Sequence, residues 1–379
     1  MLTSLKVEGY RKFKDITIND FGRINFILGN NNIGKTTVLE SIYIWACGHN
    51  VVAIVNFPLN RGRYYGMHPY WMVEEVMALV NDRNSYPLSM SFSGVFNDKP
   101  ESFFHTIYPS SLLAYYDSRY KNAGNFNVFQ FDSGLQEENK SNDLSQQRKA
   151  YQSHQWQEIA KWIVKHNDSE TLESVTYPSS SVSENNVFKP VVWLDVLSHT
   201  NVSMMMQIYS DLKRGKRMDG LVKELSEVYP DIAGFDLVPY PDGSLAPVSV
   251  IKRDGSLLPI YAFGDGVQRW FFLLGAMELY KNSIICIDEI DTGFHPGAQV
   301  EFNKHLAQYA RKNNVQLFIT THNIEFVDHF LDGVSELGDD YAKEARVITM
   351  REINKDIRFR TMSAVDAKRA RNDYKAELR

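Results

Sequence analysis

A phosphate-binding pattern spans residues 29–37. The segment reads GNNNIGKTT and fits G-x-x-x-x-G-K-[ST] without a mismatch. Its glycines let backbone N–H groups curl around a phosphate, while Lys35 offers a mobile positive charge to β- and γ-phosphates. The hydroxyl of Thr36 can complete the octahedral shell of Mg²⁺. The residues expected to contact the nucleotide here are Gly29, Asn30, Asn31, Asn32, Ile33, Gly34, Lys35, Thr36 and Thr37.

A strand and a helix must position this loop. Residues 24–28 read as a buried strand, and residues 37–45 carry apolar side chains at helical spacing. The basic turn RKFK at 11–14 has two interpretations: a solvated hairpin tip, or a turn from which Arg11 or Lys12 folds back onto a bound nucleotide. Strand, glycine turn and helix together are the context in which the motif binds phosphate.

A second set of chemical groups follows the apolar strand predicted at 283–289. A strand buried on both faces is typical of a parallel sheet, and it delivers Asp288 and Glu289 at its carboxyl end, where such sheets place ligands. Asp288 can hold the magnesium ion, and Glu289 can polarise the water that attacks the γ-phosphate. The alternative is that the two acids merely start a surface loop.

Two further segments contribute candidate groups. The strand predicted at 315–322 ends in His322, which suits a γ-phosphate sensor, although a lone histidine is also a common structural residue. Gly264, Asp265 and Gly266 precede an apolar helix at 270–279, an arrangement that favours anion binding but equally describes a plain glycine-capped helix.

Composition limits the function classes. The 379 residues are 44% apolar and carry a formal charge of −5, so bulk electrostatics give no case for nucleic acid or an acidic membrane surface. The sequence has no apolar run of membrane-spanning length and no signal-peptide pattern, so we expect a cytoplasmic protein without a membrane partner. Cys47 and Cys286 are expected to be buried apolar residues.

The order of these motifs resembles that of ABC-type ATPases of the SMC, RecF and OLD-like group. Within that group the chain is most similar to stand-alone AAA15/AAA21-type ATPases, in FGDG at 263–266, IDEIDTGFHP at 287–296 and TTHN at 320–323. The likeness covers residues 1–50 and about 220–365. It implies an α/β P-loop NTPase fold of ABC-ATPase type, with a mixed central sheet, helices on both faces and a large inserted α/β or helical lobe.

The resemblance also implies a division of the chain. Residues 1–50 would form the N-terminal part of the ATPase head, 51–240 inserted lobes or an arm, and 241–379 the C-terminal part of the head. A strand at 190–197 is expected to return the chain to the core. About 57 residues follow His322, which is too short for the Toprim nuclease domain usual in OLD-type proteins.

Family resemblance further implies a homodimer, or a higher homo-oligomer, that closes on ATP and Mg²⁺ and opens after hydrolysis. Each ATP would lie between the phosphate loop of one subunit and the signature Gly264–Asp265–Gly266 of the other, and Asp291 would lie in the loop linking the two sites. One departure is Ala262, where such families usually have serine. No Q-loop glutamine is assigned.

Three functions remain open at this point. The first is an ATP-driven switch that acts on a separate effector protein, as in the antiviral or toxin-controlling systems in which similar proteins occur. The second is a DNA-repair or chromosome-maintenance clamp that binds DNA across the closed dimer, for which the basic cluster KRGKR at 213–217 is the candidate contact. The third is a scaffold that binds ATP but hardly hydrolyses it.

Overall fold

The computed structural model describes residues 1–60, 76–82, 87–109, 157–177, 187–238, 247–291 and 293–374. All the predicted site residues lie within these ranges. Residues 110–156 of the expected insertion 51–240 lie outside them.

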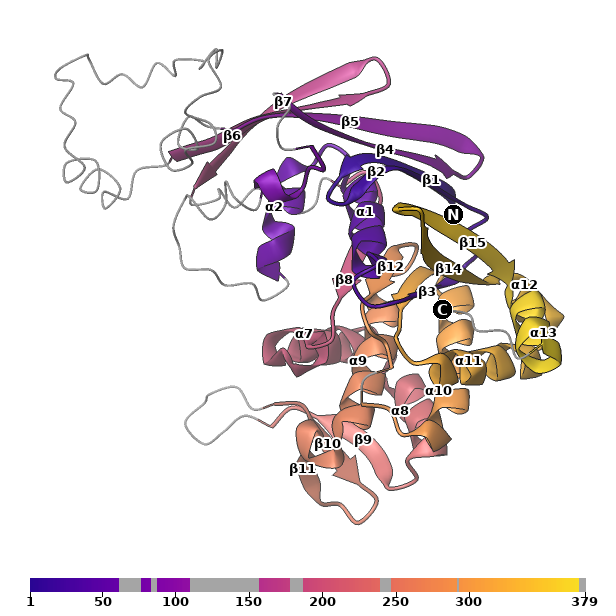
Figure 1. Ribbon diagram of the computed structural model, residues 1–379. Coiled ribbons are helices and arrows are strands. Elements are labelled where there is room, and N and C mark those ends of the chain that lie inside the picture. Colours follow the sequence, from indigo (N-terminus) through magenta and orange to yellow (C-terminus); the bar gives the residue numbers. More distant parts are fainter. Residues whose placement is uncertain are drawn as a thin grey trace.

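A six-stranded mixed sheet forms the centre of the head (Figure 1). Its order is β15–β14–β3–β13–β12–β8. Neighbours from β14 to β8 are parallel, and β15 pairs antiparallel with β14. The strands are β3 (Ile24–Gly29), β8 (Val191–Leu194), β12 (Ile284–Ile287), β13 (Gln316–Thr320), β14 (Ala345–Ile353) and β15 (Asp356–Ser363). The predicted mixed sheet is confirmed, including the returning strand near residue 190.

The two faces of this sheet pack against different helices. In β12, Ile284 and Cys286 join the apolar cluster that contains α1 (Lys35–Cys47), whereas Ile285 and Ile287 join the cluster on the opposite face. Side chains alternate between the faces of a strand, so a run with apolar residues at every position needs cover on both sides. The opposite face is covered by α9 (Asp265–Leu279), α10 (Pro296–Lys312) and α11 (Ile324–Glu336).

A second, antiparallel sheet lies beyond α1 (Figure 1). Its order is β2–β1–β4–β5–β6–β7. The strands are β1 (Leu2–Tyr10), β2 (Phe13–Asn19), β4 (Leu88–Phe96), β5 (Lys99–Pro109), β6 (Gln157–His166) and β7 (Ser169–Tyr177). Because β1 pairs with β4, the first strand of the chain and the start of the expected insertion share one sheet.

A small helical and β region surrounds the start of α9. It contains the 3₁₀ turns η1 (Ser198–Thr200) and η2 (Ile260–Phe263), the helices α7 (Val202–Arg214) and α8 (Met218–Val228), and the antiparallel sheet β11–β10–β9. Those strands are β9 (Ile232–Asp236), β10 (Ser249–Lys252) and β11 (Leu257–Pro259). The basic cluster at 213–217 lies at the break between α7 and α8, where Lys216 has a φ of +53°.

The remaining helices lie at the edges: α2 (Val51–Asn60), α12 (Asp339–Lys343) and α13 (Ala364–Tyr374). Among the helices described, none combines the length and the apolar character needed to cross a membrane. The division into 1–50, 51–240 and 241–379 stays a prediction, and the strand pairings show how its parts connect: β1 to β4, and β8 to β12.

Candidate functional site

The phosphate loop joins the end of β3 to the start of α1. Gly34 has a φ of +109°, a conformation that residues with a side chain rarely adopt, and a Cβ there would lie 2.4 Å from Cε of Lys12. A Cβ at Gly29 would lie 2.8 Å from the backbone oxygen of Met350. Gly34 is therefore required by its backbone conformation and Gly29 by the close approach of a backbone oxygen, and the loop between them lies at the N-terminus of α1, which favours an anion.

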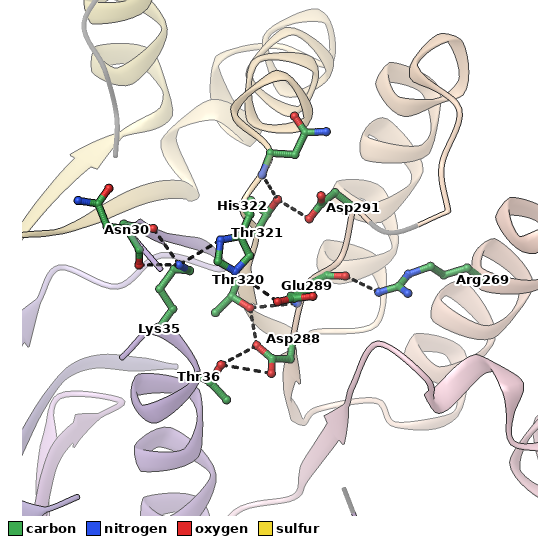
Figure 2. A network of polar contacts seen from close by, with 12 residues as sticks. Asn30, Lys35, Thr36, Arg269, Asp288, Glu289, Asp291, Thr320, Thr321 and His322 are labelled. Carbon is green, nitrogen blue, oxygen red and sulfur yellow. Dashed lines mark hydrogen bonds and ion pairs between the residues drawn. The ribbon is translucent and has the colours of Figure 1, made fainter. Parts of the chain in front are cut away.

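The ammonium of Lys35 lies across this loop (Figure 2). Its Nζ donates to the carbonyl oxygens of Gly29 at 2.8 Å and Asn30 at 3.0 Å, and lies 3.4 Å from Nδ1 of His322. Lys35 is 5% exposed. The two neutral carbonyls hold the charge in place, so a phosphate entering the loop meets an ammonium that is already positioned.

Asp288 and Thr36 come together from β12 and α1 (Figure 2). The Thr36 hydroxyl donates to Asp288 at 3.2 Å, and the hydroxyl of Thr320, at the end of β13, donates to the same carboxylate at 2.7 Å. Asp288 is 6% exposed. A carboxylate beside a hydroxyl is the hard oxygen donor set that Mg²⁺ prefers, so these residues fit the predicted ion.

Glu289 adjoins His322 at the same sheet edge. Its Oε1 lies 3.3 Å from Nε2 of His322, and both side chains are about two-fifths exposed. The backbone of Glu289 has a φ of +53°, an uncommon value for this residue type. Two contacts hold it there: its N–H donates to the Thr320 hydroxyl at 3.0 Å, and its carbonyl accepts from Arg269 at 2.6 Å.

The phosphate loop, Glu289 and His322 face one cavity of about 820 Å³, a size suited to a nucleotide. Its lining residues are Lys12, Asn31, Asn32, Gly34, Lys35, Thr36, Thr37, Glu289 and His322. The phosphate loop is thus brought next to Glu289 and His322, which lie more than 250 residues further along the chain.

The two basic residues Arg11 and Lys12 of the turn lie in different environments. Lys12 lines the cavity, and burial lowers its pKa. Arg11 turns toward α1, where its Nε lies 2.9 Å from the buried carboxylate of Glu40. Of the two residues expected to fold back onto a nucleotide, Lys12 therefore lines the cavity, whereas Arg11 is held by the buried Glu40.

The signature residues lie on a different part of the surface. Gly264 and Asp265 are exposed, and a Cβ at Gly264 would meet nothing within 4 Å. Asp265 accepts a hydrogen bond from Nε2 of the buried His199 at 2.6 Å. These residues and Gly266, which lies beside Gly293, are not among the described residues that line the cavity.

Asp291 is likewise outside the lining. Its carboxylate accepts a hydrogen bond from Thr321, next to His322 in the chain. This contact connects the loop after β12 to the loop after β13, so Asp291 supports the loop that carries His322 without lining the cavity.

Sequence reasoning missed three positioning residues. Arg269 is 1% exposed, and its guanidinium donates to the carbonyl oxygens of Glu289 at 2.6 Å and Val196 at 3.1 Å. Thr320 bonds both Asp288 and the amide of Glu289, and His199 holds Asp265. The arginine directly before the apolar run WFFLLGAMEL at 270–279 was a signal for Arg269, since a buried guanidinium needs partners.

Two protein-family models match this chain. The AAA_21 model, described as "AAA domain, putative AbiEii toxin, Type IV TA system", matches residues 87–328, more than half of the chain. The AAA_15 model, an "AAA ATPase domain", matches residues 1–62. A Smc head domain of Pyrococcus furiosus, solved with the C-terminal domain of ScpA, superposes with a TM-score of 0.50 at 9% identity, covering 99% of this chain and 100% of that one.

Two relatives are similar to this chain in sequence, one over nearly its whole length and one over a short segment. A Helicobacter pylori "ATP/GTP phosphatase" is 20% identical over 375 residues, 93% of each chain. The "DNA replication and repair protein RecF" of Coxiella burnetii is 43% identical over 47 residues, 12% of this chain and 13% of that one. Family, fold and site geometry agree: the chain belongs to the AAA_21 family and is an ATPase of the ABC- and SMC-like AAA15/AAA21 type.

Proposed function

We propose that this ATPase dimerises on ATP and acts as a conformational switch for a separate effector protein in antiviral defence. The observation that carries the proposal is the separation of two surfaces: the cavity holds Lys35, Glu289 and His322, whereas exposed Gly264 and Asp265 lie outside its lining. A second copy can bring its signature glycines to this cavity, so that ATP completes an interface which a single chain leaves open.

Each residue then has a defined task. The loop amides and Lys35 bind the β- and γ-phosphates, and Glu289 accepts a proton from the attacking water. His322, within 3.3 Å of Glu289, contacts the γ-phosphate and so distinguishes ATP from ADP. Thr36 and Asp288 would hold Mg²⁺, which would neutralise charge that develops on the phosphates. Binding and hydrolysis of the γ-phosphate are thereby coupled to opening and closing of the dimer.

The effector is inferred from the family rather than from a surface. The matched family description names a toxin of a toxin–antitoxin system, a class in which one protein controls another. The structural relative from Pyrococcus furiosus was solved with a domain of a second protein, ScpA. Both support a head that signals its nucleotide state to a separate chain.

The test combines turnover with self-association. Glu289→Gln should lower ATP turnover by roughly 10²–10⁴-fold while ATP still binds, and in Mg²⁺–ATP this variant should sediment as a dimer. Lys35→Ala, which removes the phosphate-binding ammonium, is the matched control and should remain a monomer. A Glu289→Gln chain that binds ATP but stays monomeric at all protein concentrations would refute the dimeric switch.

A DNA clamp is a second candidate, favoured by the short RecF similarity. The basic cluster offers exposed Lys213, Arg214 and Lys216, but Arg214 pairs with Asp211 at 2.8 Å and Arg217 donates to the carbonyl of Glu278. A clamp should bind duplex DNA in ATP with a steep salt dependence that weakens when the exposed lysines are changed to glutamine. Affinity that is insensitive to both changes eliminates this candidate.

A further inference from the structure

We propose that α8 and α10 together form a binding site for a divalent transition metal of the zinc class, separate from the nucleotide cavity. The two helices lie side by side on the far side of the central sheet from α1 (Figure 1). The site consists of His305 and Glu301 on α10 and Glu227 on α8, whose three donor atoms all lie within 4.8 Å of one another.

The histidine provides the central observation. His305 is buried, its side chain being 8% exposed, and its Nε2 has no hydrogen-bond partner among the described residues. That nitrogen lies 3.5 Å from Oε1 of Glu301 and 3.8 Å from Oε2 of Glu227. A buried ring nitrogen that faces two carboxylate oxygens without a hydrogen bond to either is costly in free energy, and a shared cation removes that cost.

The spacing suits such an ion. Donor atoms about 2.0–2.1 Å from a tetrahedral zinc lie roughly 3.3 Å apart. The His305–Glu301 pair is already close to that value, and Glu227 lies 3.8 Å from the same nitrogen, within the 4.8 Å that encloses all three donor atoms. The Glu227 side chain is 51% exposed, so it can make this movement and also gives the ion an approach from solvent.

Neighbouring side chains contact two of the proposed ligands, His305 and Glu301. Nδ1 of His305 faces Oε2 of Glu224 at 3.9 Å, and Glu224 also accepts a hydrogen bond from Tyr309. A carboxylate behind the second ring nitrogen is the usual way to orient a metal-binding histidine. On the other side, Lys304 binds Oε2 of Glu301 at 3.1 Å, which leaves Oε1 directed at the histidine.

The donor set also selects the kind of ion. Imidazole nitrogen favours zinc and its neighbours over magnesium, which prefers oxygen ligands alone. An ion held here ties α8 to α10 beside Trp270 of α9, whose ring centroid is 5.9 Å from that of His305. Since α9 begins at the signature residue Asp265, the metal fixes the packing of the helix that carries the signature.

The experiment counts bound zinc in the full chain without nucleotide. The protein is stripped with EDTA and dialysed against micromolar Zn²⁺ in excess Mg²⁺, so that Mg²⁺ competes for the all-oxygen pair Thr36 and Asp288. We expect one Zn²⁺ per chain and a higher melting temperature. Glu227→Gln and His305→Gln should lose both effects, and His329→Gln, on the neighbouring α11, should keep them.

Two further variants complete the design. Glu224→Gln should retain the ion with an affinity lowered roughly 10–100-fold, as expected for a group that orients a ligand. His322→Gln tests the nucleotide site as the source of bound zinc. Because Glu227 is half exposed, its variant should fold even if His305→Gln does not. The proposal is overturned if wild type binds no zinc, if Glu227→Gln binds as much as wild type, or if the loss follows His322→Gln instead.

Discussion

The Thr36 hydroxyl lies 3.2 Å from a carboxylate oxygen of Asp288, although 252 residues separate them in the chain. Thr36 lies in the first turn of α1, and Asp288 follows β12, two strands away from β3 in the central sheet. Parallel strands deliver their carboxyl ends to one edge, so the cationic loop and the acid meet there. The residues that suit Mg²⁺ and phosphate therefore lie at that edge.

Removing either oxygen of this pair should weaken ATP binding mainly when Mg²⁺ is present. Thr36→Ala and Asp288→Asn each lose a ligand to a charged group, an interaction of roughly 1.5–3 kcal/mol, so the dissociation constant should rise by about tenfold or more. Titration of a fluorescent ATP analogue with Mg²⁺ and with EDTA measures the effect. Thr36→Ser keeps the hydroxyl and is the control; equal affinities of Thr36→Ala and wild type in Mg²⁺ would contradict the assignment.

Changes at Arg11 and at Lys12, the two residues of the basic turn, should have different effects. Lys12→Ala removes a cavity-lining charge and should weaken ATP binding with little change in the free energy of unfolding. Arg11→Ala leaves Glu40, which is 1% exposed, without its arginine, and should destabilise the fold by about 3 kcal/mol. Calorimetric ATP titration and urea unfolding of both variants supply the comparison. If Arg11→Ala weakens ATP binding more than Lys12→Ala, Arg11 rather than Lys12 is the residue of this turn that contacts the nucleotide.

Arg269 should affect hydrolysis without touching ATP. Its guanidinium bonds the carbonyl of Glu289 at 2.6 Å and so holds the backbone of the catalytic candidate at its positive φ. Arg269→Lys keeps a charge but lacks the planar fork that spans two carbonyls, so we expect kcat to fall roughly tenfold with ATP affinity unchanged. Arg217→Lys, which alters a contact to Glu278 on the same helix α9, is the matched control. Equal kcat values for the two variants would exclude the positioning role.

His105 should make the antiparallel sheet sensitive to acid. Burial lowers its pKa from 6.5 to about 3, and its Nδ1 accepts a hydrogen bond from Trp162. The unfolded chain therefore binds the proton before the folded chain does, and stability present above pH 6.5 is lost as the pH falls toward 3, by about 1.4 kcal/mol per pH unit.

His105→Asn keeps an acceptor for Trp162 but does not titrate in this range. Its free energy of unfolding should fall less steeply than that of wild type between pH 6.5 and 4, as followed by urea unfolding monitored by circular dichroism, with pH 8 as the common reference. Parallel pH profiles for the two proteins would show that this histidine does not carry the acid sensitivity.

Local pattern was sufficient for much of the fold. The apolar runs at 24–28, 283–289 and 315–322 each form a central strand, because a continuous apolar segment between polar ones is stable only when buried on both faces. The expected insertion was harder, since β4–β7 extend the sheet of β1 and β2 through the pairing of β4 with β1, which no local pattern specifies.

The sequence by itself determined the chemistry: the glycines that free the loop amides, the lysine, the acid pair and the strand ends that present them. The tertiary structure alone decided that Lys12 rather than Arg11 enters the cavity, that Arg269 and Thr320 hold Glu289, and that His199 holds Asp265 away from the chain's own phosphate loop. The physical reason is the distance along the chain over which each property is set. Glycine conformation and apolar periodicity are properties of a few neighbouring residues, whereas the partner of a buried charge is set by how distant elements pack.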